Sequence, residues 1–219
     1  MTDIFDPYAE VRMGTTLVAL KYNGGVIVAS DTRTTSGNFI SDRFALKSNQ
    51  ISPSPLNFGH IYVERCGNAA HTQMITRYVY NYLNYHVMEL EENTQLSLET
   101  VTKLYKNICY NNKNSLSGAF LLTNGRELSS INTSGAFFFH DVWASHGSGS
   151  AFIDGYLRNH TKPNMSYEEA NFVITKAVAL AIAADASSGG CVRLVNVRHD
   201  GTADHTVIDN SRIEEVIMA

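Results

Sequence analysis

The order of strand-like and helix-like segments restricts the fold of this chain more than any other feature of its sequence. Apolar residues alternate in residues 15–31, repeat at helical spacing in residues 75–90 and 98–108, and alternate again from residue 118. The order is therefore strands, two helices, strands, two helices and strands, with no internal repeat. A doubly wound parallel sheet needs regular βα alternation. We therefore predict an α+β fold: a four-layer α-β-β-α sandwich of two antiparallel sheets flanked by helix pairs.

Local motifs locate several elements within this order. Residues 15–31 are predicted to form a hairpin, in which Asn23-Gly24 supplies the positive φ of a two-residue turn. Ser166-x-x-Glu169 has the pattern of a capping box and predicts the start of the last long helix. Further predictions are a strand over 60–66, a loop over the Ser-Pro repeat of 52–55, a turn at 92–94 and C-terminal strands at 191–197 and 205–208.

Composition limits the classes of function. The chain has 219 residues, 44% of them apolar and 17% charged, with a formal net charge of -4. One globular domain is expected, and the absence of a basic block argues against nucleic acid as the main partner. The longest apolar run, residues 177–184, is far shorter than the roughly 20 residues that cross a bilayer. The N-terminus has no apolar signal segment, so Cys66, Cys109 and Cys191 are expected to be reduced, buried thiols of an intracellular protein.

The common catalytic and metal-binding motifs are missing from the sequence. The glycine cluster at 147–150 has no lysine for a phosphate loop and does not match G-x-S-x-G. His199 and His205 flank a probable turn and are expected to be surface side chains rather than metal ligands. No metal site and no cofactor are therefore expected.

Ionisable residues are concentrated around the N-terminal hairpin. Gly14 precedes Thr15, and Asp31, Arg33 and Lys47 follow on or beside predicted strands. Buried charges must be paired, so composition alone favours a structural ion pair between Asp31 and Arg33 or Lys47. A catalytic group is the alternative, because a threonine hydroxyl needs a base and neighbouring charges to act as a nucleophile.

Four blocks of this sequence resemble the catalytic β subunits of the proteasome, which are N-terminal nucleophile hydrolases. The resemblance covers nearly the whole chain from Gly14 onward, with the blocks in the same order: residues 15–43, 65–73, 146–157 and 184–194. It implies the N-terminal nucleophile hydrolase fold and a threonine endopeptidase that acts on unfolded polypeptides. It also implies assembly with other α and β subunits in stacked heptameric rings in the cytoplasm and nucleus, without cofactor, metal, nucleic acid or membrane.

The resemblance also assigns roles to individual residues. Thr15 is implied as the nucleophile after cleavage of the Gly14–Thr15 bond, which would divide the chain into a propeptide, 1–14, and a single peptidase domain, 15–219. Its freed α-amine, with an unperturbed pKa of about 7.7–8.0, would be the base. The remaining implied residues are the charge partners Asp31 and Lys47, the polar cluster Ser148, Asp185 and Ser188, and Gly67, whose backbone N–H would face the oxyanion.

Substrate preference is implied by Arg65, which matches the base of the pocket for the residue before the cleaved bond (P1). An arginine there would pair with an acidic side chain, as in the caspase-like β1 type. The alternative is a surface arginine paired with Glu64 or another acid. Thr34, Ala45, Ala69 and Gln73 would line the same pocket. Two other functions remain open: a non-catalytic β subunit that supplies ring contacts, and a stand-alone amidohydrolase of the same superfamily.

Overall fold

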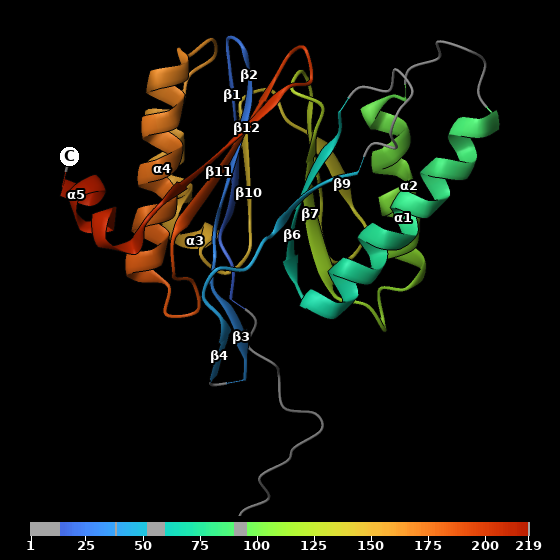
Figure 1. Ribbon diagram of the computed structural model, residues 1–219, viewed down its shortest axis with the longest axis horizontal. Helices are drawn as coiled ribbons and strands as arrows, with labels where there is room; N and C mark the ends of the chain where they lie inside the picture. The colour runs from blue at the N-terminus through green and yellow to red at the C-terminus, as the bar shows by residue number, and fades with distance from the viewer. Residues whose placement is uncertain (1–13, 38, 52–59, 90–95, 219) are drawn as a thin grey trace, which may run out of the picture.

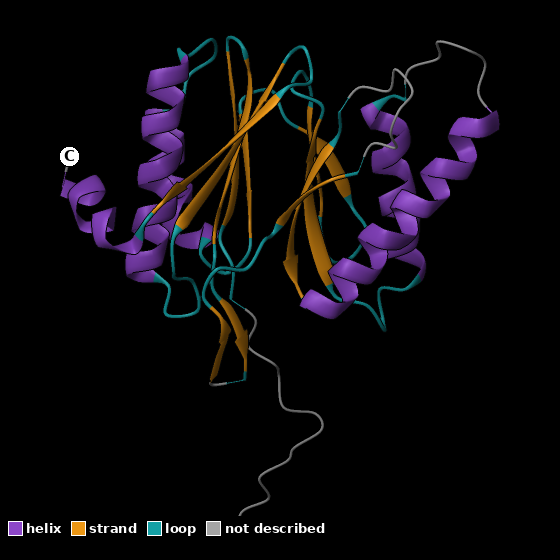
Figure 2. Cartoon of the chain, viewed as in Figure 1, coloured by secondary structure: helices purple, strands orange, loops and turns teal. Residues whose placement is uncertain are grey.

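The computed structural model describes residues 14–37, 39–51, 60–89 and 96–218, and in this part the chain forms four layers. In Figure 1, helices α3, α4 and α5 cover one sheet, and α1 and α2 cover the other, with the two sheets packed between them. Figure 2 shows the same layers by element type. The predicted α+β sandwich is confirmed. The helices are α1 (Ala69–Glu89), α2 (Leu98–Asn111), α3 (Ser150–His160), α4 (Tyr167–Ala184) and α5 (Ile213–Met218), with a 3-10 turn η1 (Asn210–Arg212).

The first sheet contains the N-terminal hairpin and has the strand order β10-β1-β2-β11-β12, with antiparallel neighbours. Tyr22 pairs with Gly25, so the predicted two-residue turn at Asn23-Gly24 is present. The positive φ predicted for that turn is wrong, because neither residue has one. A side chain at Gly24 would instead crowd the Tyr22 ring, its Cβ lying 2.8 Å from Cε2. The strands are β1 (Leu17–Tyr22), β2 (Gly25–Asp31), β10 (Trp143–His146), β11 (Val192–Arg198) and β12 (Ala203–Ile208).

The second sheet has the order β5-β6-β7-β8-β9 and is also antiparallel. A separate two-stranded ribbon, β3–β4, projects beyond the first sheet in Figure 1. The Ser-Pro segment 52–55 and the turn 92–94 lie outside the described residues. The strands are β3 (Thr34–Ser36), β4 (Phe39–Asp42), β5 (Ser48–Gln50), β6 (Tyr62–Gly67), β7 (Gly118–Thr123), β8 (Leu128–Ile131) and β9 (Phe137–Phe139).

Alternation along the strands divides the apolar side chains among three packed layers. On β1, Leu17 and Ala19 face the space between the sheets, whereas Val18 and Leu20 face α4. Between the sheets they meet Leu121 and other residues of β6, β7 and β11. Thr15 continues the odd-numbered series of β1, which brings its side chain to the open end of this inter-sheet layer.

Two local predictions, the capping box and the free buried cysteines, are also confirmed. Ser166 and Glu169 exchange both hydrogen bonds of a capping box at the start of α4. The three cysteines are free and buried. As a separate observation, none of the described helices has the length and hydropathy needed to cross a bilayer.

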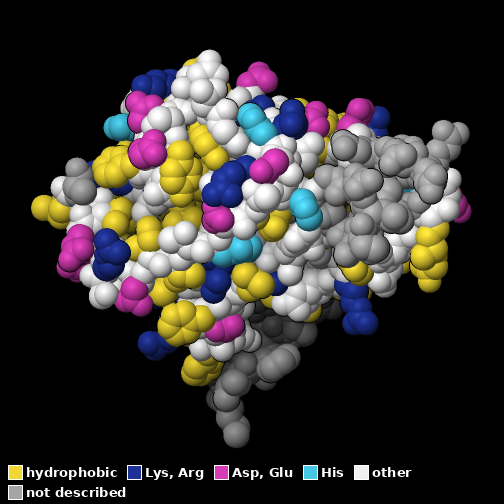
Figure 3. All heavy atoms as spheres, turned by 45° about the horizontal axis from the view of Figure 1, so that its top comes forward, with side chains coloured by type: hydrophobic (Ala, Val, Ile, Leu, Met, Phe, Trp, Pro, Cys, Tyr) yellow, Lys and Arg dark blue, Asp and Glu magenta, His cyan; other side chains and the backbone are white. Residues whose placement is uncertain are grey.

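The surface is mixed in character. On the face drawn in Figure 3, basic and acidic side chains are interspersed with apolar ones, without a large area of a single charge. This agrees with a charged fraction of 17% and a net charge of -4.

Candidate active site

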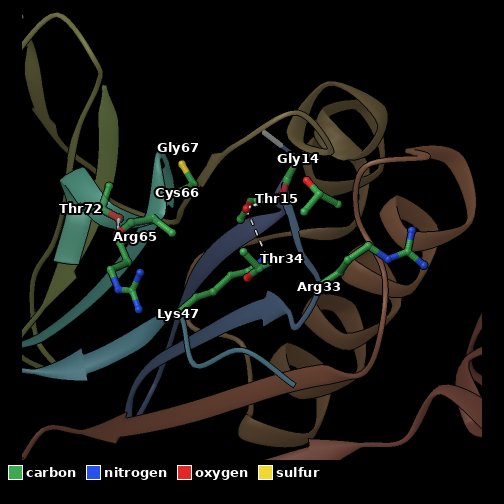
Figure 4. A pocket seen from close by; sticks show the side chains of 11 residues that line it. Gly14, Thr15, Arg33, Thr34, Lys47, Arg65, Cys66, Gly67 and Thr72 are labelled. Atoms are coloured by element: carbon green, nitrogen blue, oxygen red, sulfur yellow. Dashed lines mark hydrogen bonds between the residues drawn. The ribbon is translucent and has the colours of Figure 1, made fainter. Parts of the chain in front are cut away.

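Thr15 lies two residues before β1, and its side chain is buried. Its hydroxyl donates a hydrogen bond of 2.7 Å to the carbonyl oxygen of Gly14 and accepts one of 3.2 Å from Lys47 Nζ. Its backbone N–H donates to Ser148 Oγ at 3.2 Å. Figure 4 shows the Lys47 side chain extending toward Thr15. One hydroxyl therefore contacts both a cation and the carbonyl of its own preceding peptide bond.

The cation is held by a buried carboxylate. Lys47 Nζ lies 2.6 Å from Asp31 Oδ1, and the two side chains are 6% and 0% exposed. Asp31 also accepts backbone hydrogen bonds from Thr16, Arg33 and Gly189, so both of its oxygens are satisfied. These hydrogen bonds offset the free-energy cost of burying the Asp31–Lys47 ion pair.

The ion pair connects the two sheets. Asp31 is the last residue of β2 in the first sheet, and Lys47 immediately precedes β5 in the second. The expected ion pair thus forms with Lys47 and not with Arg33, whose guanidinium donates to the Ala186 carbonyl at 3.1 Å. Because Lys47 also contacts the Thr15 hydroxyl, a purely structural ion pair does not describe this arrangement.

A second polar group lies on the other side of Thr15. Asp185 Oδ2 accepts hydrogen bonds from Ser148 Oγ at 2.6 Å and Ser188 Oγ at 2.7 Å. Burial opposes ionisation of Asp185, but these hydrogen bonds outweigh it and lower its pKa. Ser188 Oγ is also 2.8 Å from Thr16 Oγ1. The structure thus brings the predicted Ser148, Asp185 and Ser188 together beside the Thr15 backbone nitrogen.

Glycines allow the backbone to approach this centre closely. Gly67 ends β6 with φ +100°, a conformation that favours glycine, and it lines the same pocket as Thr15. A Cβ at Gly14 would lie 1.7 Å from Ser187 Cβ, so only glycine fits before Thr15. A Cβ at Gly147, which sequence reasoning did not select, would lie 2.0 Å from the Thr15 carbonyl oxygen. Its place beside Ser148, in the block of residues 146–157, was the available signal.

The pocket beside Thr15 contains part of the predicted set. Arg65, Thr34 and Ala69 line it, whereas Ala45 and Gln73 do not. Gln73 is exposed on α1, and one residue earlier on the helix Thr72 faces the pocket instead. The residues that line the pocket are Gly14, Thr15, Arg33, Thr34, Thr35, Lys47, Arg65, Cys66, Gly67, Ala69 and Thr72.

Arg65 is a half-buried cation without an acidic partner among the described residues. Its guanidinium donates to the Leu46 carbonyl at 2.7 Å and to Asn49 Oδ1 at 3.3 Å. Glu64, the alternative partner, alternates to the opposite face of β6 and forms no ion pair with it. Burial lowers the pKa of Arg65, although the charge of Glu64 partly opposes this. In Figure 4 Arg65 lies across the pocket from Arg33, on the side of Thr72.

Other nucleophiles and metal ligands are not brought together in the part of the chain described. Burial raises the pKa of the Cys66 thiol to about 12, so it is no thiolate at neutral pH. His199 and His205 are exposed, as expected. Within the described ranges no group of three or more His, Cys, Asp or Glu side chains has the arrangement of a metal site.

Comparison with known proteins gives one consistent result. The family model described as "Proteasome subunit" matches residues 11–197. A "Probable proteasome subunit beta type-1" of Schizosaccharomyces pombe is 37% identical over 197 residues, 88% of this chain and 83% of that protein. A "Proteasome subunit beta type-6" of Dictyostelium discoideum is 34% identical over 206 residues, 92% of each chain. A "Proteasome subunit beta type-9" of Bos taurus is 37% identical over 203 residues, 91% of this chain and 88% of that protein.

The matched region contains the Thr15 centre, the second sheet, the four long helices and the first sheet apart from β12 and the last residue of β11. Three relatives from distant organisms, each covered over most of its length, are all β-type subunits. The chain therefore belongs to the proteasome subunit family, as a β subunit of the core particle in the N-terminal nucleophile hydrolase superfamily.

Proposed function

We propose that this subunit is a threonine endopeptidase that uses Thr15 Oγ as its nucleophile and cleaves preferably after acidic residues. One observation carries the proposal: the Thr15 hydroxyl contacts both the Gly14 carbonyl, at 2.7 Å, and the Lys47 ammonium, at 3.2 Å. A hydroxyl that served only packing would not need a buried cation beside it, because burying a charge is costly.

In the first reaction the chain would process itself. Thr15 Oγ attacks the Gly14 carbonyl carbon, an ester bond forms and the Gly14–Thr15 C–N bond breaks, with the hydroxyl proton passing to the departing nitrogen. Water then hydrolyses the ester and releases residues 1–14 with a new carboxyl group. The product is a chain that begins with a free α-amine at Thr15.

In the second reaction the freed α-amine acts on substrates. It would lie beside Ser148 Oγ, which is 3.2 Å from the Thr15 nitrogen and hydrogen-bonded to Asp185. The amine accepts the hydroxyl proton while the Lys47 ammonium stabilises the developing charge on Oγ. The backbone N–H of Gly67, which lines the same pocket, would donate a hydrogen bond to the oxyanion of the tetrahedral intermediate.

Arg65 supports a preference for an acidic side chain before the cleaved bond. It is half-buried at the pocket and is bound there by a carbonyl and an amide oxygen rather than by a carboxylate. A substrate carboxylate could therefore add a charge-assisted hydrogen bond.

The alternative is a non-catalytic subunit that contributes ring contacts alone. The complete set Gly14, Thr15, Asp31 and Lys47, with the Asp185 cluster, favours catalysis over this alternative. The likeness over nearly the full length of β-type relatives argues against a stand-alone amidohydrolase. As a family member the chain assembles with other proteasome subunits; stacked heptameric rings of α and β subunits, unfolded polypeptide substrates and a location in cytoplasm and nucleus are part of the proposal.

The test is the covalent state and specificity of the assembled particle. Intact mass and N-terminal sequencing should show a chain that starts at Thr15, and Thr15→Ala should keep residues 1–14 and lose turnover at this site. Thr202→Ala, a change at an exposed turn, is the matched control and should process normally. A wild-type particle that retains residues 1–14 would refute the catalytic proposal.

Specificity needs a separate measurement. Fluorogenic peptides that end in Glu or Asp should be cleaved faster than peptides that end in Tyr or Leu, and Arg65→Ala should reverse this order. A wild-type preference for Tyr or Leu would refute the role of Arg65 without affecting that of Thr15.

A further inference from the structure

A group of buried polar side chains lies between the two sheets, and the reaction proposed above makes no use of it. Its members are Ser30 of β2, Ser48 of β5 and Glu64 of β6, which are 0%, 3% and 1% exposed. Ser48 and Glu64 stand opposite each other in the β5–β6 pair and so share one face of the second sheet. Ser30 has the same parity as Val28, which faces the inter-sheet layer. Three strands from both sheets thus converge on the Glu64 carboxyl group.

These groups are not satisfied by the described chain. Both carboxyl oxygens of Glu64 and the hydroxyls of Ser30 and Ser48 are fully buried without a hydrogen bond of good geometry. Burial raises the pKa of Glu64 to about 7, although the nearby hydroxyls of Ser48 and Ser30 and the charge of Lys47 favour the carboxylate. Since an unpartnered buried carboxylate is costly, the neutral acid is the form that this environment favours.

The elements around Glu64 contribute both apolar and titratable side chains. Leu121 of β7 lies opposite it and is apolar, as are the inward residues of β1, and α1 packs on the other face of β6. The titratable or charged groups nearby are Lys47 before Ser48, Asp31 after Ser30, Tyr62 and Cys66 on the same face of β6, Arg65 after Glu64, Arg193 opposite Ser30, and His146 of β10, whose pKa burial lowers to about 4. Lys47 is the cation that favours the charged form of Glu64 most strongly.

We propose that Glu64 is a positioning residue for Lys47: it holds a proton between the sheets, and loss of this proton places a second negative charge beside the Lys47–Asp31 pair. The proton is exchanged with water and is neither consumed nor produced by the reaction. This role rests on the function proposed for Thr15 and Lys47.

Ionisation of Glu64 should slow the reaction at Thr15. With Glu64 neutral, the Lys47 ammonium is balanced by Asp31 alone and its field acts on the Thr15 hydroxyl. With Glu64 ionised, the added negative charge weakens that field and makes the hydroxyl harder to deprotonate. The rate at Thr15 is therefore expected to be reduced as Glu64 ionises.

The proton itself can be observed without any catalytic reaction. A difference infrared spectrum of the full-length chain, wild type minus Glu64→Gln, should contain a protonated-carboxyl C=O band at about pH 5 that is lost through about pH 7. Ser48→Ala removes a hydroxyl that favours the carboxylate, so it should shift the midpoint of this band to higher pH. Ser129→Ala, at a buried serine of β8 whose hydroxyl lies 2.7 Å from that of Thr102 in α2, is the matched control and should not shift it. Absence of the band would overturn the proposal.

The coupling to Thr15 is tested with the assembled particle. The ratio of kcat for Glu64→Gln to kcat for wild type should increase with pH, on the order of tenfold between about pH 6 and about pH 8, while KM stays unchanged. A purely structural role would give a ratio that does not depend on pH, which would overturn the proposal. N-terminal sequencing of the same particles separates the two hypotheses: a flat ratio in chains that begin at Thr15 refutes only the role of Glu64, whereas chains that retain residues 1–14 refute the proposed function.

Discussion

The buried acid Glu64 makes the stability of the chain depend on pH in a way that can be calculated. Its pKa is raised from 4.5 to about 7, mainly by burial. The native state therefore binds more protons than the unfolded state between these pH values, so the free energy of unfolding falls as pH rises through this window. At 1.36 kcal/mol per pKa unit, the loss is about 3 kcal/mol, complete above about pH 7.

Glu64→Gln should remove this dependence. Relative to wild type, the variant should gain about 3 kcal/mol between about pH 4.5 and about pH 8, which is a large part of the stability of an ordinary domain. Urea denaturation at several pH values, with Thr15→Ala in both proteins to prevent processing, measures the difference. Glu214→Gln, at an exposed acid of α5, is the control and should show no such trend. A difference between wild type and Glu64→Gln that stays constant with pH would refute the reasoning.

Three further changes test other parts of the structure. Gly14→Ala should slow cleavage after residue 14 on the order of 100-fold, because its Cβ would displace the backbone, whereas Gly155→Ala, with open space around it, should not; a gel time course measures both. Lys47→Ala should lower the free energy of unfolding by about 3–5 kcal/mol, because Asp31 is left buried and unpaired, and should stop processing. Ser166→Ala should cost about 1 kcal/mol in thermal unfolding without changing the rate at Thr15.

Much of the fold could be predicted from the sequence because its determinants are local. The period of apolar residues separated helices from strands, and the Ser166–Glu169 motif located the start of α4. The Asn23-Gly24 turn shows the limit of such rules. Its position follows from the flanking strands, but Gly24 fits there because a Cβ would crowd the Tyr22 ring and not because of a positive φ, which the dipeptide alone does not specify.

The candidate site was less accessible to sequence reasoning because it depends on long-range contacts. The residues alone left open whether Asp31 pairs with Arg33 or Lys47, and the choice is made where β2 and β5 meet across the two sheets. Gln73 was expected at the pocket, but one helical residue corresponds to a rotation of about 100°, so Thr72 takes that place. Matching motifs by their position in the sequence does not show which face of the helix a residue occupies.

Glu64 was expected only as a partner for Arg65, and its burial does not follow from the apolar pattern of β6. Tyr62, Glu64 and Cys66 share one face of β6, and two of the three are apolar side chains of the kind that enter a core. Ile61 and Val63, on the face of β6 that carries Arg65, are equally buried, so alternation separates Glu64 from Arg65 but does not tell which of the two is enclosed. The error was to treat neighbours in sequence as neighbours in space on a strand, where adjacent side chains point to opposite faces.

The position of these charges has a consequence for how the chain balances stability and chemistry. The inter-sheet layer is apolar over most of its area and becomes polar at the end where Thr15, Lys47 and Asp31 meet. Each polar group there lowers the stability that apolar packing would give at the same position, and Glu64 does so more as pH rises. The apolar remainder of the layer can offset that cost because both sheets also pack against helices on their outer faces. Since Asp31 and Lys47 belong to different sheets, any change that alters the packing of the sheets must also alter the distance between Lys47 and Thr15. Stability of the sandwich and reactivity of the hydroxyl are therefore determined by the same interface.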